Sequence, residues 1–111
     1  MSKNRYCIVL VTVSSREEAE KIVRSLLEEK IIACANIIGP VFSIFWWHGR
    51  IDNAQENLIL MKTKESLFSR LAERVKTLHS YQVPEIIAIP IVKGYKPYMD
   101  WLESNLNSTT N

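Results

Sequence analysis

Hydrophobic and polar residues recur along the chain with periods that predict an ordered series of strands and helices. Residues Tyr6–Val13 form a short, nearly unbroken apolar run rich in Val and Ile, which predicts a buried central strand. A helix is expected from Ser15 to about Lys30, because Ser15 and Glu18 have the spacing of a capping box and charged residues lie opposite an apolar stripe. This stripe consists of Ala19, Ile22, Val23, Leu26 and Leu27.

The middle of the chain predicts an unusually long β-hairpin. Ile31–Ile38 alternates as a strand, and Gly39-Pro40 indicates a bend or bulge within it rather than its end. Val41–Trp47 continues the strand, and His48-Gly49 offers a turn. The return strand is expected to run up to Thr63.

The last third of the chain predicts a helix, a short strand and a terminal helix. An amphipathic pattern covers Lys64–Leu78, and Pro90 in the strand Glu85–Ile91 indicates a sheet edge or a strand end. Pro97 suits the first turn of the terminal helix. The expected buried face of that helix consists of Tyr98, Trp101 and Leu102. The polar tail from Ser104 has no core pattern, so we expect a frayed end.

The predicted element order is β-α-β-β-α-β followed by a helix. This order is typical of the α+β ferredoxin-like fold, also called the split βαβ fold, in which two helices cover one face of an antiparallel four-stranded sheet. A chain of 111 residues suits one domain and is too short for two. We expect a single domain over residues 1–111, with its core at about 6–106 and a disordered tail at 107–111.

Composition and charge exclude several classes of protein. With 47% hydrophobic and 23% charged residues, most of the chain is expected to be folded. No run of about 18 apolar residues occurs, so no membrane insertion is expected. The 14 basic and 12 acidic side chains are interspersed, which argues against a dedicated nucleic-acid surface. No signal-peptide pattern precedes the first strand, so we expect a cytoplasmic protein with free thiols at Cys7 and Cys34.

The predicted hairpin carries more large apolar side chains than one face of a strand can bury. They are Phe42, Ile44, Phe45, Trp46 and Trp47, of which Phe42, Ile44 and Trp46 share one face. Either the terminal helix covers the second apolar face, or further copies of the chain do, since large apolar patches usually mark interfaces. A long projecting arm can pair with the sheet edge of a neighbour, and closed symmetry is then the usual result.

The segment between the second helix and the last strand holds the best candidates for ligand binding. It places His79, Tyr81 and Glu85 next to Pro84, and loops of this kind often carry function. His79 has two interpretations. It is either a metal ligand or a cap at the C-terminus of the helix, where its positive form suits the helix dipole.

Two further residues have both a functional and a structural interpretation. Cys34 is either a soft metal ligand or a small buried hydrophobe. Lys62, at the end of an apolar strand, either binds an anion or extends its ammonium group to the sheet edge. Because the sequence has no C-x-x-C, H-x-x-x-H or carboxylate cluster, a closed zinc site is not expected.

Catalysis and RNA binding have little support in the sequence. Glycine occurs only at positions 39, 49 and 94, which leaves no Gly-rich phosphate loop, and no nucleophile lies near a His and an orienting acid. The chain is therefore predicted not to be an enzyme. The strand Asn57–Thr63 has no aromatic residue, whereas RNA-recognition domains with this topology stack bases on aromatic side chains there.

Five blocks of the sequence carry a resemblance to a known family. They are Ala33–Ile38, Ser43–Ile51, Lys62-Thr63, Leu78–Ile87 and Tyr98–Leu102. In their order and spacing they are similar to the CutA family of divalent-cation tolerance proteins. The resemblance extends from about Tyr6 to Leu106.

This resemblance implies a ferredoxin-like subunit within a tight homotrimer, with an architecture like that of the PII signalling proteins. Hairpin arms and last strands would join the sheets of neighbouring subunits. The resemblance also implies a link to tolerance of divalent metals, with copper or another divalent cation as the ligand. A cleft between subunits would hold Cys34, Lys62, His79, Tyr81 and Glu85.

The leading hypothesis is therefore a homotrimeric cytoplasmic protein of the divalent-metal response, which binds or signals rather than catalyses. His79 and Cys34 are its candidate metal ligands. The alternative is a small-molecule sensor or enzyme whose site lies in the clefts between subunits, where Lys62 and Glu85 would orient a small polar ligand. A third hypothesis is a structural trimer that presents its outer surface to a partner.

Overall fold

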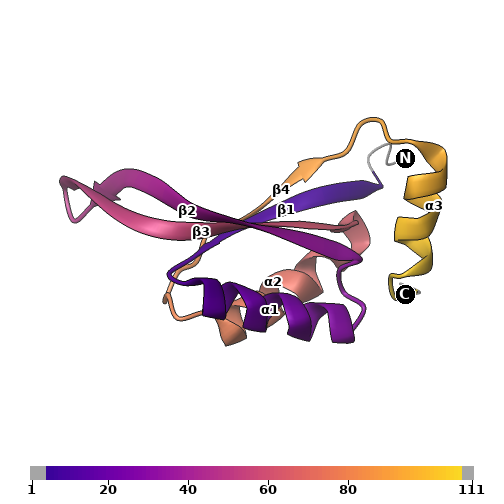
Figure 1. Cartoon of the computed structure of the whole chain (residues 1–111), viewed down its shortest axis with the longest axis horizontal. Helices are drawn as coiled ribbons and strands as arrows, with labels where there is room; N and C mark the ends of the chain where they lie inside the picture. The colour runs from indigo at the N-terminus through magenta and orange to yellow at the C-terminus, as the bar shows by residue number, and fades with distance from the viewer. Residues whose placement is uncertain (1–4, 109–111) are drawn as a thin grey trace.

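The computed structural model describes residues 5–108 and forms an antiparallel sheet with the strand order β2-β3-β1-β4. Its strands are β1 (Tyr6–Val13), β2 (Cys34–Trp47), β3 (Arg50–Lys64) and β4 (Ile86–Pro90). Its helices are α1 (Arg16–Glu28), α2 (Phe68–Leu78), which a 3-10 turn at Glu65–Leu67 precedes, and α3 (Lys96–Ser104). Helices α1 and α2 cover one face of the sheet, and α3 stands across one end (Figure 1). The predicted ferredoxin-like fold is confirmed.

The core lies between the sheet and the two covering helices. Every second residue of β1 is buried there, from Cys7 to Val13, while the intervening residues face the other side of the sheet. Strand β3 adds Ile59 and Met61 beside β1, and the apolar stripes of the helices complete the core. The buried residues of these stripes are Ala19, Ile22, Val23 and Leu26 of α1 and Leu71 and Val75 of α2. As predicted, the Ser15 hydroxyl accepts a hydrogen bond from the Glu18 N–H at 3.1 Å and caps α1.

Strands β2 and β3 continue far beyond the rest of the sheet. Strand β1 ends at Val13, opposite Asn57, so that residues 41–56 project as a two-stranded ribbon, here called the hairpin arm (Figure 1). The predicted bulge is present as a register shift around Gly39-Pro40, where a larger residue at position 39 would meet the Asn57 side chain. His48 and Gly49 have φ angles of 50° and 74°, as a type I′ hairpin turn requires.

Helix α3 packs differently from the prediction. Leu102 is fully buried, in a small second core with Ala33, Leu67 and Leu106. Tyr98 and Trp101 remain 40% and 45% exposed, because α3 contacts the end of the sheet through one narrow side. Their assignment to the buried face was therefore wrong. Since α3 lies at the end of the molecule opposite the hairpin arm, it leaves the aromatic residues of the arm uncovered (Figure 1).

The frayed tail predicted from Ser104 was also wrong as far as Asn107. Leu106 is buried, the Asn107 N–H donates to the Lys30 carbonyl at 3.0 Å, and the Asn107 side-chain amide donates to the Glu29 carbonyl at 2.5 Å. The polar sequence of the tail does not predict these contacts, because they join segments that lie far apart in sequence. The predicted disorder of residues 109–111 falls outside the described residues.

A buried ammonium group fastens α3 to the sheet. The Nζ atom of Lys64 donates to Glu103 Oε2 at 2.8 Å, and the Tyr6 hydroxyl donates to Glu103 Oε1 at 2.8 Å. The Lys64 side chain is only 5% exposed, so its charge depends on this carboxylate. The hydrogen bond from Lys64 outweighs the effect of burial and holds the pKa of Glu103 below its usual value.

The substitution Glu103→Gln is expected to lower the free energy of unfolding at pH 7 by roughly 1–2 kcal/mol, a range that allows for solvent screening of this part-exposed carboxylate. Because the pKa of Glu103 is lower in the folded state, the carboxylate stabilises the fold at neutral pH, and this stabilisation is lost as the pH falls through the folded-state pKa. Chemical denaturation of wild type and variant measures the difference. A difference that stays constant from pH 7 to below about pH 4 would contradict this role.

Candidate functional site

The sheet has one face that neither α1 nor α2 covers, here called the open face (Figure 1). Strand register places a continuous apolar surface on it, formed by Ile8, Leu10, Ile38, Leu58, Leu60, Ile87 and Ile89. Ile38, Ile87 and Ile89 are about half exposed. Monomeric proteins rarely expose contiguous apolar surfaces of this kind, so the open face is a candidate interface.

The hairpin arm has exposed apolar side chains on both faces, and strand register places Phe45 and Trp47 on the same side as the open face. Phe42, Ile44 and Trp46 lie on one face of the arm and are 65%, 65% and 72% exposed. On the other face, Trp47 is 58% exposed. The structure therefore gives the predicted aromatic residues no cover within the described chain, on either face of the arm.

A groove of about 850 Å³ runs between the hairpin arm and the loop that joins α2 to β4. Its apolar wall contains Phe45, Trp47 and Val83, and its carboxylates belong to Asp52, Glu56 and Glu85. No basic side chain is among its lining residues. We call it the acidic groove. The predicted residues Tyr81 and Glu85 both line it, whereas Asp52 and Glu56 were not recognised from the sequence, because no motif links the arm to this loop.

Tyr81 joins the loop to the base of the hairpin arm. Its hydroxyl donates to Glu56 Oε2 at 2.6 Å, and the Glu56 side chain is buried. Burial, together with the hydrogen bond to the Glu56 carboxylate, raises the pKa of Tyr81 far above its usual value. Tyr81 is thus a neutral hydrogen-bond donor that fixes one wall of the acidic groove.

His79 lies behind this wall, with its side chain fully buried. Its Nδ1 accepts from the Tyr81 N–H at 3.0 Å, so the proton is on Nε2, which donates to the Thr12 carbonyl at 2.8 Å. The backbone N–H of His79 also caps α2 through the Val75 carbonyl. Both ring nitrogens are engaged within the chain. In this arrangement His79 has no nitrogen to offer a metal ion, and it positions Tyr81 instead.

Glu18 holds the same loop from the start of α1. Its carboxylate accepts hydrogen bonds from the Ser80 N–H, the Ser80 hydroxyl and the Ser14 hydroxyl, at 2.7, 3.0 and 2.8 Å. Burial pushes the pKa of Glu18 upward, but these hydrogen bonds outweigh that effect and hold the pKa below its usual value. The sequence indicated only the capping role of Glu18, because its contact with Ser80 spans 62 residues.

Cys34 and Lys62 lie at the other end of the open face. Lys62 donates to Asn36 Oδ1 at 2.6 Å, and Cys34 Sγ is 3.4 Å from the Tyr98 hydroxyl, a contact that helps to raise the pKa of Tyr98 to about 12. Lys62 pairs with Ile8 near the start of β1, whereas His79 contacts its far end. One chain therefore does not bring the five predicted cleft residues together. Residues 5–108 contain no group of three or more His, Cys, Asp or Glu side chains that could hold a metal ion.

The fold and these surfaces define a class: ferredoxin-like proteins with a long hairpin arm and an uncovered apolar sheet face. The family model described as "CutA1 divalent ion tolerance protein" matches residues 7–105. The divalent-cation tolerance protein CutA of Thermus thermophilus is 48% identical over 98 residues, which are 88% of this chain and 95% of the relative. The chain belongs to the CutA1 divalent ion tolerance family.

Solved structures agree with this assignment. The CutA1 structure from Thermus thermophilus has a TM-score of 0.90 and 46% identity, over 92% of this chain and 99% of that one. CutA1 from Oryza sativa has a TM-score of 0.92 and 37% identity, over 96% and 98% of the two chains. The rice relative called "Protein CutA 1, chloroplastic" is longer, and the matched 98 residues are 55% of its length.

The relatives come from different compartments. One solved structure is of the periplasmic divalent cation tolerance protein CutA from Archaeoglobus fulgidus, and the rice relative is named as chloroplastic. Family membership therefore does not decide where this chain is located. In the part of the chain that the structure describes, no helix has both the length and the apolar character to cross a membrane.

The hydrogen bond between Tyr81 and Glu56 predicts an abnormal alkaline titration. Tyrosinate absorbance should rise by the same amount in wild type and Tyr81→Phe between about pH 9 and pH 11, because Tyr81 does not ionise in the window of an ordinary tyrosine. In Glu56→Gln, which removes the negative charge, Tyr81 should titrate closer to that window. A rise in wild type that exceeds the rise in Tyr81→Phe by one tyrosine would contradict the proposed bond.

Proposed function

We propose that this chain works as a homotrimer in the response to divalent cations, copper foremost, with a binding or signalling role in the cytoplasm rather than a catalytic one. The observation that carries the proposal is the apolar surface that one chain leaves open on its sheet and its hairpin arm. The names of the relatives, which describe divalent-cation tolerance, support the physiological role.

Self-assembly would bury the apolar surface that a single chain leaves exposed. The sheet has two unpaired edges, β2 and β4, and the arm extends the β2 edge past the body of the molecule. Pairing of the β2 edge of one copy with the β4 edge of the next joins two different surfaces. Such heterologous contacts close into a ring when the rotation permits, and a trimer is a small closed ring.

The same arrangement brings the predicted ligand residues together. Tyr81 and Glu85 lie at the arm end of the open face, whereas Cys34 and Lys62 lie at its other end. Head-to-tail contact places the second pair of one copy beside the first pair of the next. We place the ligand cleft at this junction. A cation site there draws its ligands from more than one copy, with Cys34 as its soft ligand.

Trp47→Ala tests the assembly. In one chain the ring is 58% exposed, so its loss would have little effect, whereas burial in an interface makes the loss cost roughly 3–5 kcal/mol. Leu27→Ala, at the margin of the apolar stripe of α1, is the control with a part-exposed side chain outside the proposed interface. Thermal unfolding should show a large decrease in Tm for Trp47→Ala alone. Equal Tm values for wild type and Trp47→Ala would exclude Trp47 from any interface.

Copper titration by calorimetry tests the metal role. Saturable binding is expected, weakened about tenfold or more in Cys34→Ser, since even the outer-shell partners of metal ligands contribute that much. Cys7→Ala is the control, because that thiol is buried beneath the helices. Absence of saturable binding would contradict the metal role. Unchanged binding in Cys34→Ser would remove Cys34 from the ligand set.

A small-molecule sensor or enzyme is the second candidate function, and the acidic groove with its ordered Tyr81–Glu56 pair favours it. In this case Lys62 and Glu85 orient a polar ligand within the cleft. A thermal-shift screen of metals, nucleotides and metabolites separates the two functions. Stabilisation by a metabolite but by no divalent cation would support this candidate and contradict the first.

A further inference from the structure

The acidic groove has a chemical complement elsewhere on the same chain. The segment between β4 and α3, residues 91–95, has no regular secondary structure, and together with Lys96 it is here called the basic linker. Its exposed side chains combine apolar surface with positive charge. They are Val92, Lys93, Tyr95 and Lys96, and Val92 and Tyr95 are three-quarters exposed.

The acidic groove and the basic linker each carry a charged side chain that has no ion-pair partner within residues 5–108, and the two charges have opposite signs. Lys96 already forms an ion pair with Asp100 at 2.9 Å, but Lys93 has no ion-pair partner within residues 5–108. At the groove, Glu85 is exposed and likewise forms no ion pair with those residues. The groove thus has the carboxylate of Glu85 near aromatic rings, and the linker has the ammonium group of Lys93 near the ring of Tyr95. Neither charged group forms an ion pair within residues 5–108.

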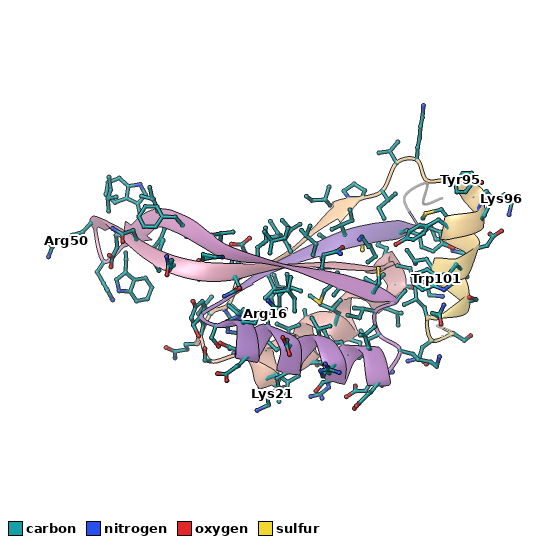
Figure 2. All side chains as sticks on the ribbon, viewed as in Figure 1. Arg16, Lys21, Arg50, Tyr95, Lys96 and Trp101 are labelled. Atoms are coloured by element: carbon teal, nitrogen blue, oxygen red, sulfur yellow. The ribbon has the colours of Figure 1, made fainter. Side chains whose placement is uncertain are left out.

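One chain cannot bring these two surfaces into contact. The molecule is about 43 Å long, and Figure 2 shows Tyr95 and Lys96 at one end and Arg50, at the tip of the arm, at the other. The groove belongs to the arm end. A contact between the linker and the groove therefore requires two copies in the head-to-tail arrangement that the free edges β2 and β4 allow.

We propose that the basic linker of one copy occupies the acidic groove of the next copy, with Lys93 facing Glu85 and Asp52 and Tyr95 packed against Trp47. Tyr95 has extended backbone angles, and if Lys93 and Gly94 are extended too, the linker presents the ammonium group of Lys93 and the phenol ring of Tyr95 on the same side. The linker follows β4 directly, so pairing of the β4 edge with a neighbouring arm leads it toward that neighbour's groove.

This inference rests on the proposed self-assembly and names the residues of its ionic contact. Within the same chain, Gly94 of the linker packs so closely on the Met99 side chain that a larger residue would displace that side chain. The linker backbone at Gly94 thus lies against the Met99 side chain of α3.

Cross-linking between cysteines tests the contact directly. In a Cys34→Ser background, the pair Gln82→Cys and Lys93→Cys, carried on the same chain, is treated with a short bismaleimide. Covalent dimers and trimers are expected. The matched control joins Gln82→Cys with Lys21→Cys, which lies on the outer side of α1, and should remain monomeric in a denaturing gel.

If no cross-link forms, native mass spectrometry of the untreated proteins shows whether the docking of the linker or the self-assembly itself is wrong. A trimer whose linker pair does not cross-link would overturn the docking of the linker and leave the proposed assembly intact, with the groove open to a small ligand. A folded wild-type monomer would overturn both.

Charge reversal gives an independent readout. Lys93→Glu should raise the dissociation constant of the assembly several-fold, because it places a carboxylate against Glu85 and Asp52. The double variant Lys93→Glu with Glu85→Lys should recover most of the loss, whereas Lys21→Glu should have no effect. An identical dissociation constant for wild type and Lys93→Glu would overturn the proposed contact.

Discussion

The burial of apolar surface on both faces of one thin sheet is the constraint on which the rest of the structure depends. Helices α1 and α2 cover only one face, and their charged outer sides are suited to water. The other face carries a continuous row of Ile and Leu residues that nothing in the described chain covers. The hairpin arm adds exposed aromatic side chains to this surface. We infer that one folded chain buries only part of its apolar surface, and that self-association buries the rest.

Polar contacts position the loop at the arm end of this surface. Hydrogen bonds from Ser80 to Glu18, from His79 to Thr12 and from Tyr81 to Glu56 tie the loop to the start of α1, the end of β1 and the base of the arm. Because His79 and Glu56 are buried and each of these groups has a hydrogen-bond partner, the contacts hold the loop as a defined wall. In our proposal, that wall is the half of the ligand cleft that each chain contributes to its neighbour.

Much of the fold was predictable from the sequence, because local patterns determine it. The apolar run of β1, the capping box of α1 and the Gly39-Pro40 interruption each gave the correct element. The errors involve contacts between distant segments. Nothing local distinguishes the buried Leu102 from the exposed Trp101 beside it, and Leu106 packs against residues that precede it by more than thirty positions. The placement of Cys34 and His79 at opposite ends of the sheet likewise depends on strand register.

Sedimentation equilibrium of the purified chain, diluted through the micromolar range, tests the central claim most directly. The account predicts a single species with three times the mass of one chain that persists on dilution. A compact, fully folded particle with the mass of one chain would contradict it, because the open face and both faces of the hairpin arm would then be stable in water without a partner.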